Sequence, residues 1–142
     1  MADEFLWRKQ ILPFGTIHWR DRELNFTPAY MCDIAAAFAG GAFDLVPFMA
    51  ENPEWGPGGD PALYRGAVRG LEVVSDGMDA LVLAGAETDA WLDADRELGA
   101  APRLVENYRT TAGLVFPVAV MSLHATSAPG IAGLRPWTRE PA

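Results

Sequence analysis

Serine and histidine side chains near the carboxyl end of the chain have the types and the spacing that nucleophilic chemistry requires. Ser122 and His124 are two residues apart, and Ser127 follows shortly after them. On a strand, Ser122 and His124 would point to the same face, where an imidazole can take the proton of a hydroxyl that attacks a carbonyl carbon. The sequence therefore offers a candidate hydrolytic set, and the alternative is that this histidine lies beside serines by coincidence.

Other chemical motifs are not found in the sequence. It has no phosphate-binding loop, dinucleotide fingerprint, nucleophile elbow or metal-binding motif. Cys32 is the only cysteine, which excludes an internal disulfide and a multi-thiolate metal site. With only two histidines, neither a metal nor a cofactor is expected. Four acids crowd one predicted helix and are expected to form a solvated face: Asp89, Asp93, Asp95 and Glu97.

Length and composition indicate one globular domain over residues 1–142. The hydrophobic fraction is 50% and the charged fraction is 21%, which is typical of a folded domain. The formal net charge of −8 disfavours nucleic acid and anionic membranes as partners, because like charges repel at long range. Asp33 and Asp44 interrupt the most apolar stretch, so no membrane span is expected. The amino terminus carries acids where a signal peptide needs cations, which predicts a cytoplasmic protein.

A hairpin over residues 63–84 is the clearest structural signal. Two apolar runs flank Ser75-Asp76-Gly77, where Asp76 and Gly77 are expected to take the positive φ angles of a tight turn. The strands draw their apolar positions from Val68, Leu71, Val73, Leu81 and Leu83. The polar residues that interrupt them are expected to be partly solvated: Arg69, Glu72 and Asp79.

Two helices and several further strands surround this hairpin. Residues 10–26 predict two short strands with a turn at 20–22, the first an edge or bulged strand because of Pro13. Thr27 and Pro28 predict a helix that ends at 40–41. Its expected buried stripe is Tyr30, Ile34 and Phe38.

The second half of the chain continues the same alternation. Residues 43–49 predict a strand, Thr88 and Asp89 a second helix that Gly99 ends, and residues 103–108 and 114–120 two more strands. The expected fold is therefore α+β, with a small, mostly antiparallel β-barrel or sheet and two main helices.

Two tryptophans are candidate contacts for a partner protein. Trp55 lies in a loop rich in glycine and proline over residues 51–61, either packed back on the domain or exposed as an anchor. Trp137 lies in the extended carboxyl-terminal segment, residues 127–142. Extended segments that carry aromatic residues can become ordered on a partner.

Five phrases occur in order along nearly the whole chain: residues 10–17, 43–48, 60–66, 98–108 and 133–137. Together they resemble the capsid maturation (prohead) proteases of tailed bacteriophages, which share their fold with the herpesvirus assemblin serine proteases. The resemblance implies an assemblin-like fold.

The sequence departs from the family pattern at both reactive positions. The segment that carries the nucleophilic serine in the family has Ala101 in its place, and the loop that carries the histidine has Pro57. Alanine has no oxygen to attack a peptide carbonyl, and proline has no ring nitrogen to accept a proton. Losing either group of such a set lowers turnover on the order of a million-fold. The resemblance therefore implies a catalytically degenerate pseudoenzyme.

The leading hypothesis is a non-catalytic structural protein of a phage particle that binds the major capsid protein and self-associates. Its acidity disfavours the DNA-lined interior of a shell, so a decoration or minor capsid protein outside the shell, or an early scaffold, fits better. Such a protein would occur in the bacterial cytoplasm during assembly and in the procapsid or virion. The rival hypothesis is an active serine-type maturation protease that uses displaced residues: Ser122, His124 and Ser127.

Overall fold

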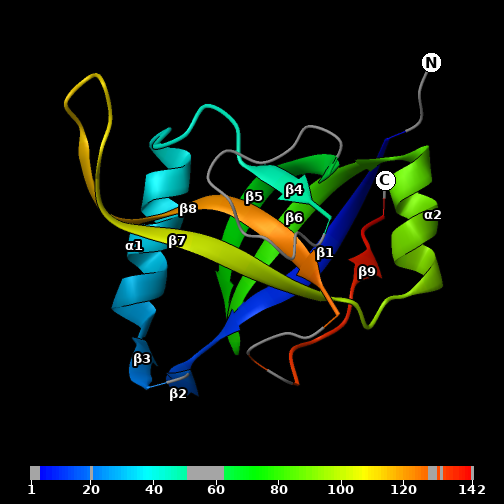
Figure 1. Ribbon diagram of the computed structural model, residues 1–142, viewed down its shortest axis with the longest axis horizontal. Coiled ribbons are helices and arrows are strands. Elements are labelled where there is room, and N and C mark those ends of the chain that lie inside the picture. Colours follow the sequence, from blue (N-terminus) through cyan, green and yellow to red (C-terminus); the bar gives the residue numbers. More distant parts are fainter. Residues whose placement is uncertain (1–3, 20, 51–62, 128–130, 132, 142) are drawn as a thin grey trace.

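The computed structural model describes residues 4–19, 21–50, 63–127, 131 and 133–141. These residues form an α+β fold with a seven-stranded sheet, a separate two-stranded hairpin and two helices, which lie at opposite ends of the sheet (Figure 1). The elements, in chain order, are β1 (Glu4–Pro13), β2 (Gly15–Trp19), β3 (Arg22–Phe26), α1 (Pro28–Ala39), β4 (Pro47–Met49), β5 (Tyr64–Val74), β6 (Gly77–Gly85), α2 (Ala86–Ala94), β7 (Gly99–Arg109), β8 (Val115–Thr126) and β9 (Thr138–Arg139).

The large sheet is open and mostly antiparallel, with the strand order β7-β8-β4-β5-β6-β1-β9. Among the strands that the structure describes, only β4 and β8 pair in parallel. Of the two architectures expected from the sequence, the structure has the sheet, because β7 and β9 are the two ends of the ladder and do not pair with each other. None of the described helices has the length and apolarity needed to cross a membrane.

The central hairpin of β5 and β6 is confirmed, with two corrections. Gly77 has φ 146° and Asp76 does not share the positive φ expected of it. A Cβ atom at Gly77 would clash with the carbonyl oxygen of Leu12, so glycine is required there. The expected solvation of Asp79 is wrong, because this residue is only 2% exposed and its carboxylate binds the side chains of Arg8 and Arg135.

Helix α1 begins and ends as its sequence predicts. The Thr27 hydroxyl accepts a hydrogen bond from the backbone N–H of Tyr30 at 3.1 Å, and Gly40 follows the last helical residue. Ile34 is fully buried as expected, whereas Tyr30 and Phe38 are only half-buried. The fully buried residues of the helix are Met31, Ile34 and Ala37.

The expected start and end of helix α2 are wrong. The helix begins at Ala86, two residues before Thr88, and the Thr88 hydroxyl donates instead to the carbonyl oxygen of Arg65 at 2.7 Å. Asp89 lies in the first turn and accepts hydrogen bonds from the Trp7 indole and the Arg139 guanidinium, so it is paired and not solvated. The helix ends at Ala94, and Gly99 begins strand β7.

Several strands have other bounds than the sequence predicts. Strand β1 already begins at Glu4 and lies between β6 and β9, so it is an internal strand and not an edge. Its pairing shifts between Gln10 and Leu12, which confirms the alternative of a bulge near Pro13. The strand expected over residues 43–49 is limited to β4, and β8 continues to Thr126.

The carboxyl-terminal segment is part of the folded domain. Trp137 is 0% exposed, lies 5.2 Å from the ring of Phe48, and donates its indole N–H to the carbonyl oxygen of Leu98 at 2.9 Å. Arg135 and Glu140, on either side of it, form ion pairs with Asp79 and Arg8. Trp137 therefore belongs to the core and does not form the exposed contact that the sequence suggested.

Candidate functional site

Strand β8 carries Ser122 and His124 on the face of the sheet opposite to the main core. Leu123 and Ala125 belong to that core, and side chains alternate along a strand, so the residues between them point the other way. A bulge sets this orientation, because Arg103 pairs with Ser122 whereas the next residue of β7 pairs with Val120. The extra residue in β8 reverses the alternation, since Val120 itself faces the core.

The Ser122 hydroxyl and the His124 imidazole form a direct hydrogen bond, with 2.7 Å between Ser122 Oγ and His124 Nε2. The expectation that both side chains share one face is therefore confirmed. The pair is also buried, since Ser122 is 6% exposed and His124 is 7% exposed. This burial distinguishes the pair from a nucleophile that lies open to a peptide substrate.

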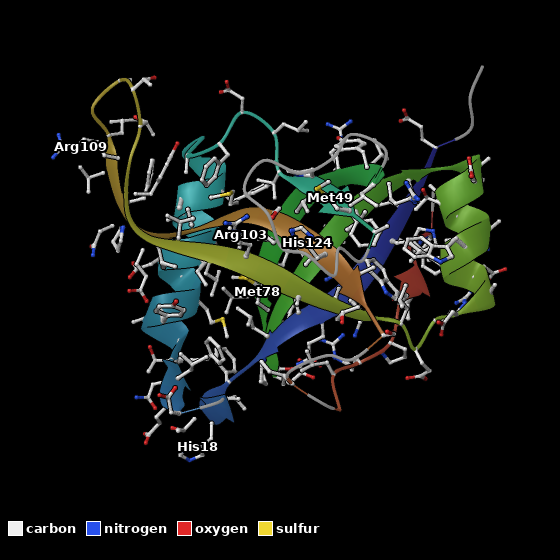
Figure 2. All side chains as sticks on the ribbon, viewed as in Figure 1. His18, Met49, Met78, Arg103, Arg109 and His124 are labelled. Carbon is white, nitrogen blue, oxygen red and sulfur yellow. The ribbon has the colours of Figure 1, made fainter. Side chains whose placement is uncertain are left out.

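Three further side chains surround this pair. Ala101 on β7 lies directly opposite His124 in the antiparallel ladder, and Met49 on β4 is its partner on the other side. Arg103, two residues after Ala101, lies opposite Ser122. Figure 2 shows Met49, Arg103 and His124 close together over the middle of the sheet. We call Ala101, Arg103, Ser122 and His124, with Met49, the β8 cluster.

The environment of His124 favours its neutral form. Burial lowers the pKa of His124 below its usual value, and the positive charge of Arg103 lowers the pKa further. The imidazole is therefore uncharged at neutral pH. A neutral imidazole can accept the proton of the Ser122 hydroxyl, which is the property that a general base needs.

Replacing Arg103 by glutamine is expected to raise the pKa of His124 toward its usual value. A neutral amide no longer repels the imidazolium, while the contribution of burial remains, so the rise is only part of the whole shift. The titration of the His124 ring protons by NMR measures the change. The control is Arg109→Gln, an exposed position at the end of the same strand. An equal pKa shift in both variants, or none with Arg103→Gln, would contradict this assignment.

The chemistry of the β8 cluster is limited by the burial of the Ser122 hydroxyl. A nucleophilic serine must reach a substrate carbonyl, and donors must stabilise the oxyanion that forms. The Ser122 hydroxyl is buried and already bonded to the imidazole, and the residue that faces His124 from β7 offers only the methyl group of Ala101. The arrangement places an imidazole that can accept a proton opposite an alanine, which carries no nucleophile.

The structure brings together only some of the residues singled out in the sequence. Ser122, His124 and Ala101 lie together in the β8 cluster, whereas Ser127 is exposed one residue beyond the end of β8. Pro57 and Trp55 lie outside the described residues.

Met49 and Arg103 are not among the site residues expected from the sequence. The signal for Arg103 was available, because on a strand it shares a face with Ala101 two residues before it. No such local signal exists for Met49, which joins the β8 cluster through the parallel pairing of β4 with β8.

A search of the described residues for three or more histidine, cysteine, aspartate or glutamate side chains that could hold a metal ion found no such group. Comparison of the chain with models of protein families, with curated proteins and with solved structures found no significant match.

Proposed function

We propose that this protein is a non-catalytic structural component of a tailed-phage particle, derived from a prohead protease fold, that binds the major capsid protein. The observation that carries the proposal is the ladder pairing of Ala101 with His124. The family resemblance aligns Ala101 with the nucleophilic serine, and this position adjoins a buried, neutral imidazole. A serine there would lie beside a base, and alanine leaves that base without a nucleophile on the neighbouring strand.

The burial of the Ser122 hydroxyl further supports a site that has lost its catalytic activity. The hydroxyl forms a hydrogen bond with the imidazole within a single strand, which stabilises the β8 cluster without exposing a reactive group. A protein without this activity can still bind the major capsid protein. The net charge of −8 favours a decoration, minor capsid or scaffolding role away from packaged DNA, because DNA is also negatively charged. The protein would act in the bacterial cytoplasm during assembly and in the procapsid or virion.

The proposal predicts that the purified protein cosediments with procapsids or mature shells and occupies repeated positions on the capsid lattice. Electron cryomicroscopy of the particles, together with mass spectrometry of their protein content, provides the test. Absence of the chain from both procapsids and virions would overturn the proposed function.

An active serine-type maturation protease is the second candidate. The 2.7 Å hydrogen bond between Ser122 and His124 favours it, because this geometry is the one that a nucleophile and its general base adopt. Such activity requires an opening motion that exposes the Ser122 hydroxyl. The protease hypothesis predicts slow cleavage of the capsid precursor that stops when Ser122 is replaced by alanine.

A further inference from the structure

The hairpin that joins β7 to β8 exposes apolar side chains at its tip. Leu114 and Val115 are 54% and 55% exposed, among the most exposed large hydrophobic residues described. The turn is well defined, since the backbone N–H of Thr110 donates to the carbonyl oxygen of Leu114 at 2.8 Å and Gly113 has φ 89°. Figure 1 shows this hairpin projecting past α1, away from the rest of the sheet. We call residues 109–115 the hairpin tip.

A groove of about 610 Å³ lies at the same end of the molecule, lined by apolar side chains and by the charged Asp44 and Arg69. The segment between α1 and β4 forms one wall, with Phe43 and Leu45, while β5 contributes Val68 and β6 contributes Leu83. Leu45 is 55% exposed at its rim. Phe43 stacks on Tyr108 of β7 with 4.5 Å between the ring centroids, so the groove adjoins the base of the hairpin.

The charges around the tip and the groove are complementary. Arg109 is exposed next to Val115, its partner in the ladder, and Glu106 is exposed three residues earlier. The groove carries an exposed carboxylate, Asp44, and an exposed guanidinium, Arg69. Each surface therefore offers one anion and one cation to the other, together with an apolar centre. This pattern of an apolar centre with a charged rim is typical of protein interfaces.

We propose that the hairpin tip of one copy of this chain docks into the groove of a second copy. Leu114 and Val115 enter the apolar groove, and Arg109 pairs with Asp44 of the other copy. Because tip and groove lie at the same end of the molecule, two copies can exchange tips about a two-fold axis, which makes the interface self-complementary and closed. The inference rests on this surface alone and does not depend on the capsid function.

Sedimentation of the purified full chain over a range of concentrations tests the proposal. The expected result is a reversible monomer–dimer equilibrium that the double variant Leu114→Asp, Val115→Asp weakens by at least about ten-fold, because it places charges against the apolar groove. The matched control is Val73→Asp, an exposed apolar position of β5 that belongs to neither surface.

A charge exchange provides the second arm and uses only exposed positions, so folding is preserved. Arg109→Asp and Asp44→Arg should each weaken self-association, because each places like charges together at both contacts. A mixture of these two variants should form heterodimers, since one contact then has the native pair and the other the reversed pair. A wild-type chain that stays monomeric up to about 1 mM would overturn the proposal. Dimers that survive the tip variant, or variants that fail to recover on mixing, would overturn it too.

Discussion

Replacing Trp137 by alanine is expected to lower the free energy of unfolding by about 4 kcal/mol. The indole is 0% exposed and packs against Phe48, so its removal leaves a large cavity in the core. The carbonyl oxygen of Leu98 also loses the donor that it has at 2.9 Å. Urea unfolding followed by circular dichroism measures the loss.

The control for Trp137→Ala is Leu45→Ala, an exposed apolar residue for which a change of less than about 0.5 kcal/mol is expected. The two variants together test whether the carboxyl-terminal segment is packed in the core or attached only at the surface. If Trp137→Ala changes the stability no more than Leu45→Ala does, the carboxyl-terminal segment is not part of the cooperative core.

Replacing Asp79 by asparagine is expected to cost about 3 kcal/mol of stability. Its carboxylate is 3% exposed and pairs with Arg8 at 2.9 Å and with Arg135 at 2.6 Å. Asparagine keeps the shape of the side chain, but a neutral amide binds two guanidinium groups far more weakly. Because Arg135 belongs to the carboxyl-terminal segment, the variant should also weaken the attachment of that segment. Hydrogen exchange of the Trp137 indole N–H measures this local effect.

The matched control for Asp79→Asn is Asp93→Asn. Asp93 has a similar ion pair, at 2.6 Å from Arg96, but its side chain is 49% exposed. Solvent screens such a surface pair, so a much smaller loss than that of Asp79→Asn is expected. Equal losses in both variants would mean that the burial of Asp79 has no energetic consequence.

Local signals in the sequence were enough to predict the central hairpin and helix α1. The Asp-Gly turn and the Thr-Pro start act within a few residues, and both are at the expected places. Helix α2 shows how such signals fail. Thr88 has the side chain of a helix cap, but Arg65, 23 residues earlier, provides the carbonyl that its hydroxyl binds. Tertiary contacts overrode the local preference of Thr88.

The expected solvent exposure of Asp79 and Trp137 is wrong for a related reason. Both are brought into the interior by the return of the carboxyl-terminal segment over the sheet, where Arg135 meets Asp79 and the indole meets Phe48. A polar residue in an apolar strand normally indicates solvent, and a tryptophan in a proline-rich tail normally indicates a loose segment. Neither local pattern can predict a contact with a residue more than 50 positions away in the sequence.

The candidate site was predictable only in part. The spacing of Ser122 and His124 correctly predicted one shared face, because this inference needs only a strand. Their burial and the presence of Arg103 depend on the bulge in β8 and on the register with β7. The position of Ala101 opposite His124 depends on the same register. The resemblance implies that Ala101 stands in the place of the nucleophilic serine. The strand pairing adds that Ala101 lies opposite His124.

The most direct test of the central claim is to incubate the purified protein with the major capsid protein precursor and to follow both binding and cleavage, with a fluorophosphonate probe for reactive serine. We predict that the two proteins form a complex, that the precursor stays intact, and that the probe labels no serine. Labelling or cleavage that Ser122→Ala abolishes and Ser127→Ala leaves unchanged would contradict the account and establish the β8 cluster as a working protease site.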